Sequence, residues 1–250
     1  STHIVWRWKV SDAASQLPPE YQKLMVPLDE CKPVNGGKEI LLTSSGGGAL
    51  LLDKETKQCR FYAHVPIAHS IAMLLGRRIA IALSTHPQGN SLELYDADKP
   101  AEVLFRDSLY SGHGVVWMEK SQRLYALGFD ELRAYTLEQW ETDAPLLKLE
   151  KTWKLPIDNG HDLVRLSDYE LGFSGYEDVY KFDLANETFT LFQPMQGKKD
   201  IKSFNYDAET GYLVYTQAEI DWWTHHIYIE HPMKVLTLEN INLYKVRTFE

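Results

Sequence analysis

IAHSIAM (67–73), SGHGVVW (111–117) and NGHDLVR (159–165) are the stretches that decide the fold. Each places a histidine directly before a short run of Val, Ile, Leu or other apolar residues, and such runs are typical of buried strands. The histidines are 44 and 48 residues apart. A repeat of this length is typical of the blades of a β-propeller, so the three stretches indicate one repeated β unit.

The same register continues in both directions, with a lysine in place of the histidine. Upstream, ECKPV (30–34) places Lys32 there, and downstream DIKSFNY (200–206) places Lys202 there. The register therefore predicts five units, which begin at Lys32, His69, His113, His161 and Lys202 with spacings of 37, 44, 48 and 41 residues.

Each unit contains further short apolar runs, separated by turn formers such as DKETK, DADKP and DAETG. The predicted second strands are 39–45, 78–84, 123–128, 169–175 and 212–218; the third are 48–53, 91–96, 131–137, 178–184 and 226–230; the fourth are 58–63, 102–107, 146–153, 188–193 and 243–249. Four strands per unit favour an all-β propeller of five four-stranded blades, in one domain over residues 1–250.

Two architectures remain open beside this one. HIVWRWKV (3–10) is predicted as a strand that closes the ring beside the last blade, or that remains from a partial sixth blade. A β-sandwich with coincidental repeats is the other alternative. Residues 11–24 have room for one short turn of helix, limited by their two prolines.

Composition excludes some classes of function. The net charge of −9 argues against a general nucleic-acid binder, which would present a basic surface. The longest apolar stretch, 67–75, is too short to span a bilayer.

The chain begins with Ser1 rather than Met, so we expect that a targeting segment has been removed. Cys31 and Cys59 either pair or remain free thiols.

The first residues of the inner strands of a propeller lie at one mouth of its central channel. We therefore expect Lys32, His69, His113, His161 and Lys202 to form a ring there. The loops between second and third strands open on the same face. They are expected to add Thr43, Ser44, Thr85, His86, Asp130, Glu131, Tyr176, Glu177, Gln217, Glu219, Asp221, Trp222 and Trp223.

Five basic or potentially basic groups placed together cost free energy unless something offsets their charge. A carboxylate, phosphate or sulfate of a ligand is one such partner. The alternative is that His69, His113 and His161 stay neutral and bind a divalent metal such as Zn, Mn or Ca, in the manner of three-histidine sites. A purely structural role, in which each basic residue fits the same niche of its blade, is also open.

The loop TQAEIDWW (216–223) suggests a sugar ligand. Trp222 can stack on a sugar ring, and Gln217 and Glu219 can bind its hydroxyl groups. Tyr176 stands beside Glu177 at the expected mouth, where a tyrosine or histidine can remove a proton next to a bound carboxylate. The chain contains neither GxSxG nor HExxH.

The set IAHSIAML, IALSTHPQGNSLELYD, SGHGVVW, LGFDELRAY, GHDLV and VYTQAEIDWW resembles an uncharacterised family of exported bacterial β-propeller proteins, a domain-of-unknown-function family. The resemblance covers most of the chain from about Val5 onward, and it implies the propeller fold and a periplasmic or secreted location. The architecture is also distantly similar to propeller polysaccharide lyases, whose channel-mouth histidines bind a metal or a uronate carboxylate.

We expect the protein to bind, and in the mechanistic version to cleave, an acidic oligosaccharide or another small anionic ligand. In a lyase, His113, His161 and Tyr176 would be catalytic. Lys32, His69, Lys202, Glu177, Gln217, Glu219 and Trp222 would bind the substrate. A glycoside hydrolase would need two carboxylates about 5 to 10 Å apart. The alternative is a non-catalytic extracytoplasmic propeller that binds sugar or protein. For a protein-binding scaffold we expect a filled channel and a broad apolar patch.

Overall fold

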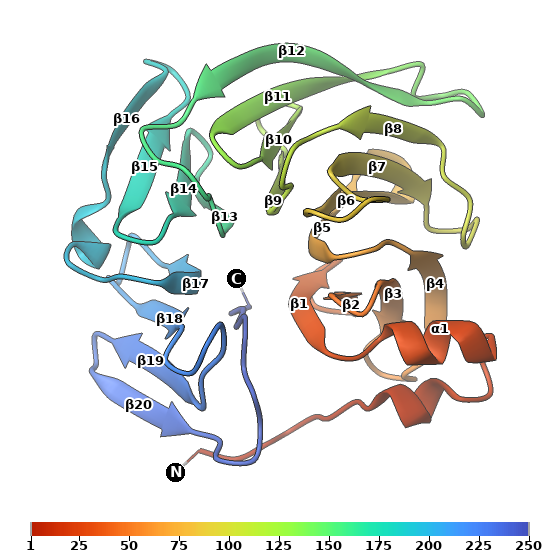
Figure 1. Ribbon diagram of the computed structural model, residues 1–250, viewed down its shortest axis with the longest axis horizontal. Helices are drawn as coiled ribbons and strands as arrows, with labels where there is room; N and C mark the ends of the chain where they lie inside the picture. Colours follow the sequence, from red (N-terminus) through yellow and green to blue (C-terminus); the bar gives the residue numbers. More distant parts are fainter. Residues whose placement is uncertain (1, 250) are drawn as a thin grey trace.

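The computed structural model describes residues 2–249, and it shows five four-stranded antiparallel sheets around a central channel (Figure 1). Blade 1 contains β1 (Leu28–Val34), β2 (Glu39–Ser44), β3 (Gly48–Asp53) and β4 (Cys59–His64). Blade 2 contains β5 (Ala68–Leu74), β6 (Arg78–Leu83), β7 (Ser91–Asp96) and β8 (Phe105–Ser108). Blade 3 contains β9 (Gly114–Met118), β10 (Arg123–Leu127), β11 (Glu131–Glu138) and β12 (Leu146–Lys154).

Blade 4 contains β13 (Leu163–Ser167), β14 (Glu170–Ser174), β15 (Val179–Asp183) and β16 (Thr188–Leu191), and blade 5 contains β17 (Ile201–Tyr206), β18 (Leu213–Gln217), β19 (His226–Glu230) and β20 (Lys234–Thr237). In every blade the strands pair in chain order, and the first strand lies innermost (Figure 1). The predicted five-bladed propeller is therefore confirmed.

Four of the interfaces between neighbouring blades are apolar. Leu51 and Phe61 of blade 1, for example, pack with Ile71 and Ile81 of blade 2, and similar clusters join blades 2 to 3, 3 to 4 and 4 to 5. Burying one such side chain stabilises the fold by about 1.5–3 kcal/mol. Among residues 2–249, no comparable apolar cluster joins blade 5 to blade 1.

The N-terminal residues cover the face of blade 1 that has no neighbouring blade. Trp6, Trp8, Leu17 and Met25 pack on that face against Ile40, Leu42, Leu50 and Leu52. The predicted strand 3–10 is therefore wrong: the tryptophans bury their rings on the sheet face rather than pairing at its edge. A 3₁₀ turn (Val10–Ala13) and helix α1 (Pro19–Leu24) follow, and α1 tolerates Pro19 in its first turn.

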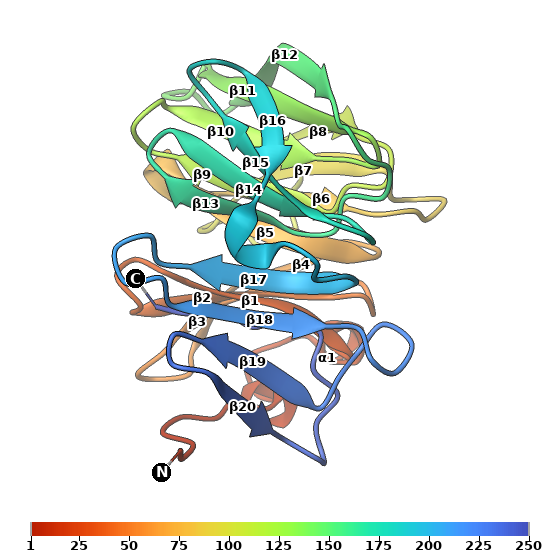
Figure 2. The same ribbon diagram turned by 90° about the vertical axis from the view of Figure 1, so that its left-hand side faces the viewer.

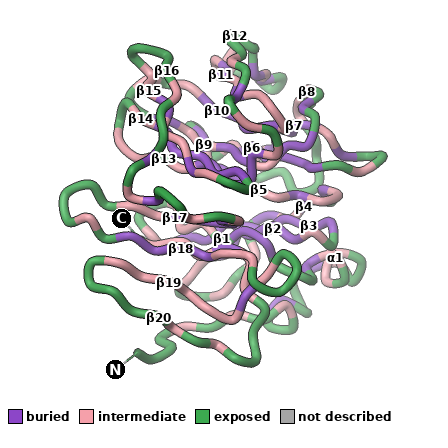
Figure 3. Tube along the Cα trace, turned by 60° about the vertical axis from the view of Figure 1, so that its left-hand side comes forward, coloured by how far each residue is buried: buried purple, intermediate pink, exposed green. Residues whose placement is uncertain are grey.

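The C-terminal residues 243–248, here called the C-terminal strap, run along β17 into the channel (Figures 1 and 2). The predicted fourth strand at 243–249 is therefore wrong, because β20 takes that place in blade 5. Burial is highest in the second strand of each blade, whereas the outer strands and the N-terminal residues are more exposed (Figure 3). None of the helices in residues 2–249 has the length and apolar character that a membrane span requires.

The strap occupies the position that an inner strand of a sixth blade would take. The Val115 N–H donates to the Ser70 Oγ of the preceding blade, and the Phe204 N–H donates to the Asp162 carboxylate of its preceding blade. The Val246 N–H donates in the same way to the Ser203 Oγ of blade 5. The strap thus repeats the contact by which one inner strand joins the next.

Candidate functional site

A register shift near the start of the inner strand marks one mouth of the channel. His69 is the extra residue between the pairs Ala68–Leu83 and Ser70–Ala82, and Lys202 is the extra residue between Ile201–Gln217 and Ser203–Thr216. In blade 1 the extra residue is Asp29, between Leu28–Ser44 and Glu30–Thr43. The register predicted at Lys32 is therefore wrong by three residues, because the repeat follows the bulge and not the basic side chain.

The structure brings His69, His113 and His161 together at this mouth. The ring centroids of His69 and His113 are 4.7 Å apart, and those of His113 and His161 are 5.7 Å apart. Tyr176 stands edge-on to His161 at 4.6 Å, and Tyr244 of the strap lies 6.1 Å from His69. Five aromatic or imidazole rings therefore follow one another around the channel mouth.

The imidazoles are held by neighbours and are neutral where they are most buried. His69 Nδ1 lies 3.0 Å from the Asp29 carboxylate, and His113 Nδ1 donates to the Ser111 carbonyl at 2.8 Å. Burial, helped by the nearby His69, lowers the pKa of His113 well below its usual value. Burial and then the Lys202 ammonium lower the pKa of His161 to about 3. His113 and His161 are therefore uncharged at neutral pH.

Lys202 is a cation of the mouth that, like Lys32 of β1, makes no ion pair among residues 2–249, while Asp200 acts on its charge from farther away. Its ammonium donates to His161 Nε2 at 3.3 Å and stands 5.2 Å from the centre of the Tyr176 ring. Within the described part of the chain, no carboxylate lies within 4 Å of it. Because His161 Nε2 accepts this bond, its Nδ1 carries the proton, and that buried N–H has no partner among the described residues.

A buried ionic cluster fills the channel beneath the rings. Arg247 donates to both carboxylate oxygens of Glu30 at 2.7 and 2.8 Å and to both oxygens of Asp162 at 2.9 and 2.6 Å. Lys245 lies 3.5 Å from Glu30 and 3.4 Å from Asp162, and donates to the His69 carbonyl at 2.9 Å. Burial alone would raise the pKa of Glu30 and Asp162, but Arg247 and Lys245 outweigh it and lower both.

The mouth and channel hold three buried carboxylates and four cations, and the half-buried Asp200 also acts on Lys202. The acids are Asp29, Glu30 and Asp162, and the bases are Lys32, Lys202, Lys245 and Arg247. Lys32 itself lies across the channel, where it donates to the Val115 carbonyl at 2.9 Å and to Ser70 Oγ at 3.4 Å. Burial lowers the pKa of Lys32 to about 8, so this group still carries its charge at neutral pH.

The sequence match to a known family covers every residue of the site described above. The model of a family of unknown function, DUF6528, matches residues 1–249. The chain belongs to this family. No curated protein sequence matches the chain.

The loop residues predicted for this DUF6528 site divide into two groups. Tyr176 and Trp222 are 46% and 58% exposed, so both can meet a ligand. Glu177 is instead paired with Lys199 at 2.7 Å, and Gln217 Nε2 donates to the Lys199 carbonyl at 2.8 Å.

Glu219 is also engaged within its own loop. It accepts hydrogen bonds from Thr224 and from Tyr228 at 2.9 Å, and it lies 3.0 Å from His226. Glu177, Gln217 and Glu219 thus have partners outside the ring of histidines, and a ligand would have to displace those partners to bind them.

The metal hypothesis for His69, His113 and His161 stays a prediction. Over residues 2–249, no three His, Cys, Asp or Glu side chains are arranged to hold a metal ion. His69 directs Nδ1 at Asp29 and His113 directs Nδ1 at Ser111, so a metal would have to use their Nε2 atoms. The present geometry favours imidazoles that bond a ligand directly.

Sequence reasoning missed Asp29, Tyr244 and the ionic cluster. One signal was available: Asp29-Glu30 has the same spacing as His161-Asp162, and each pair joins a mouth residue to a buried carboxylate. No comparable signal marks the strap, because LYKVRTF (243–249) alternates apolar and polar residues as an outer strand does. The strap lies in the channel because no sixth blade fills the space between blades 5 and 1, and its own composition does not indicate this position.

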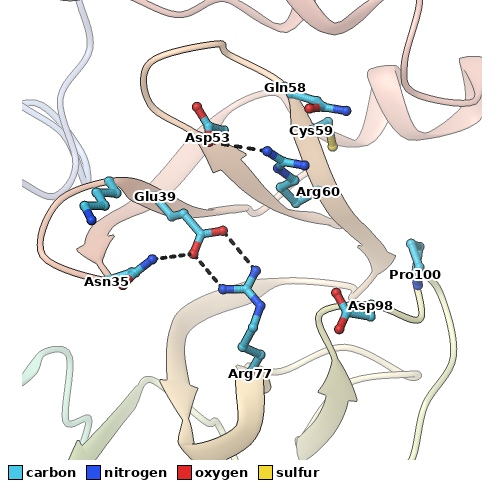
Figure 4. A pocket seen from close by; sticks show the side chains of 10 residues that line it. Asn35, Glu39, Asp53, Gln58, Cys59, Arg60, Arg77, Asp98 and Pro100 are labelled. Carbon is cyan, nitrogen blue, oxygen red and sulfur yellow. Dashed lines mark hydrogen bonds and ion pairs between the residues drawn. The ribbon is translucent and has the colours of Figure 1, made fainter.

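A second pocket lies at the opposite end of the molecule, between blades 1 and 2 (Figure 4). Arg77 there donates to both oxygens of the buried Glu39 at 2.8 and 3.0 Å, and Asn35 also donates to Glu39. Arg60 faces Asp53 at 3.5 Å. Two acidic groups of this pocket thus pair with arginines, and the exposed Lys38 also lines it. Cys59 lies in its wall, and both cysteines are free thiols.

Proposed function

We propose that the channel mouth binds a ligand that carries a carboxylate, and specifically a uronate unit of an acidic oligosaccharide. The observation that carries the proposal is the Lys202 ammonium, which is buried, has no carboxylate within 4 Å among residues 2–249 and lies beside the exposed Tyr176 ring. A buried cation without a counter-ion is costly, and a ligand carboxylate removes that cost. A periplasmic or secreted location, which the family resemblance implies, would expose the mouth to such glycans.

The rings around Lys202 support a sugar rather than an inorganic anion. Tyr176 presents an exposed ring beside Lys202, and Trp222 presents another on the β18–β19 loop of the same face. Aromatic faces of this kind bury the apolar side of a pyranose. The neutral imidazole of His113 offers a hydrogen-bonding nitrogen to a hydroxyl or carboxylate without adding charge.

A protein that binds its ligand without converting it is consistent with most of the contacts at the mouth and in the channel. The channel beneath the mouth is filled by the strap. Glu30 and Asp162, the two carboxylates that converge in the channel, are both bonded to Arg247 and buried. They are therefore unsuited to act as the acid and base of a hydrolase.

One observation favours a lyase as the second candidate. His113 donates through Nδ1 to the Ser111 carbonyl, so its Nε2 keeps a lone pair that can accept a proton. In such a step the proton next to the uronate carboxylate would pass to the imidazole or to Tyr176. The glycosidic C–O bond would then break to leave an unsaturated sugar, and the leaving oxygen would take up a proton from the protonated base or from water, with Lys202 offsetting the carboxylate charge.

Isothermal titration calorimetry with trigalacturonate tests the proposal, with the neutral trisaccharide of galactose as the control ligand. We expect trigalacturonate to bind and Lys202→Gln to weaken binding about tenfold to a hundredfold, the worth of a charge-assisted hydrogen bond. Lys199→Gln, which removes an exposed lysine from the neighbouring loop, should leave binding unchanged.

Absence of binding, or equal binding by Lys202→Gln, would overturn the proposal. Incubation of trigalacturonate with the protein separates the two candidates. An unsaturated product that absorbs in the near ultraviolet, and that is lost in His113→Ala, would make the protein a lyase. Binding without that product leaves the binding function.

A further inference from the structure

The strap is held differently from the five inner strands that it resembles. The Thr216 Oγ1 donates to the Tyr244 carbonyl at 2.7 Å, and Asn205 bonds the Val246 carbonyl at 2.9 Å and the Thr248 N–H at 3.3 Å. These bonds use side chains of blade 5 rather than a backbone ladder. Residues 243–248 belong to no named strand, and Leu243 makes a single isolated bridge with Thr224. The strap therefore has no sheet behind it.

The side of the strap that faces blade 1 is joined to it through charges. Arg247 and Lys245 contact Glu30 of β1, whereas the next residue, Cys31, is exposed instead of packed. This interface lacks the apolar contacts that join the other blades, so it is the easiest of the five to open.

The strap also forms part of the mouth. The Tyr244 ring is the neighbour of His69, and the Lys245 ammonium donates to the His69 carbonyl. The Lys245 charge contributes, after burial, to the lowered pKa of His113, His161 and Lys202. Departure of the strap would remove one wall of the mouth and two of its four positive charges.

We propose that the C-terminal strap is a reversible closing element of the mouth site, and that its seating and ligand binding stabilise each other. The coupling to a ligand rests on the proposed function, whereas the reversible seating rests on the contacts alone. Physically, a ligand that contacts Lys202 and His69 needs the wall that Tyr244 and Lys245 supply. The protein with its strap displaced would lack that wall and bind the ligand more weakly.

Hydrogen–deuterium exchange of the C-terminal peptide tests this inference. The Val246 and Thr248 amides should exchange faster than the Val115 and Phe204 amides, which occupy or adjoin the equivalent bonds of complete blades. Ser203→Ala should speed exchange of the strap about fivefold to tenfold. Ser70→Ala, which removes the equivalent hydroxyl between blades 2 and 3, should leave exchange of the strap unchanged. Saturating trigalacturonate should slow exchange of the strap at least threefold, in line with binding to the seated form.

The outcomes separate the two proposals. Reversible seating would be overturned if the strap amides exchange as slowly as the Phe204 amide and if Ser203→Ala does not change their exchange. If calorimetry detects binding of trigalacturonate but exchange of the strap does not change, the coupling is wrong and the proposed function stands. If calorimetry detects no binding, the proposed function and the coupling both fall, while the comparison of Ser203→Ala with Ser70→Ala still decides the seating.

Discussion

His161 shows how one residue of the mouth is tied to the stability of the whole fold. It is buried, uncharged and bonded to the Lys202 ammonium, and its folded pKa of about 3 lies far below the 6.5 of an ordinary histidine. The unfolded chain therefore binds more protons than the folded chain between these two values. Stability rises with pH in this window and is lost as the pH falls.

We predict that the free energy of unfolding falls by up to about 1.4 kcal/mol per pH unit for each of His113 and His161 as the pH drops from 6.5 to 5. Urea unfolding at several pH values measures this slope. His161→Gln should reduce this slope by the contribution of one histidine. His231→Gln, at an exposed position, should leave the slope unchanged. A slope equal in His161→Gln and in the wild type would contradict the buried neutral imidazole.

Arg247 illustrates what a short element can do when it enters the channel. Its guanidinium joins Glu30 of blade 1 to Asp162 of blade 4, so one side chain of the strap connects two blades that share no interface. Lys245 alone cannot compensate both carboxylates, because its single charge lies 3.4 Å from Asp162 and 3.5 Å from Glu30. Removing one partner from such a buried cluster leaves an uncompensated charge.

Arg247→Met is therefore expected to destabilise the protein by about 3–5 kcal/mol. Arg123→Met is the matched control, because Arg123 pairs with Glu150 at the surface, where an ion pair is worth about 0–1 kcal/mol. Chemical denaturation of both variants gives the comparison. A loss of less than about 1 kcal/mol for Arg247→Met would show that the cluster does not close the ring.

The limits of sequence reasoning appear most clearly at the level of elements. Four strands per unit were predictable in blades 1 to 4 because most of their strands are short runs rich in apolar residues between turn formers, whereas β20 of blade 5 was missed. The inner strands were identifiable because Gly-His and Ala-His precede three of them. The ends of the chain were not predictable. HIVWRWKV and LYKVRTF both carry strand-like alternation, yet one covers a sheet face and the other enters the channel. Both positions follow from a vacancy between blades 5 and 1 that only the assembled ring creates.

At the scale of the whole molecule, the N-terminal residues replace the neighbour that blade 1 lacks. Met25 is 1% exposed and packs on the free face of that blade with Leu17 and the tryptophans. The two faces of β2 and β3 are therefore both buried, which is why EILLTS and GALLLD are buried along almost their whole length instead of alternating.

Met25→Ala should cost about 2–5 kcal/mol of folding free energy, as other large-to-small changes in a core do. Met233→Ala removes the same side chain from a position that is 82% exposed and should cost almost nothing. Urea unfolding of the two variants in parallel measures the difference in their folding free energies. Equal stabilities would mean that the N-terminal residues are not part of the core of the propeller.

The most direct test of the account is a crystal structure of the protein with trigalacturonate. A ligand carboxylate oxygen should lie about 2.7–3.2 Å from Lys202 Nζ, with a sugar ring against Tyr176 and the strap in place. A trisaccharide bound only elsewhere, for example in the pocket between blades 1 and 2, would contradict the assignment of the channel mouth as the binding site.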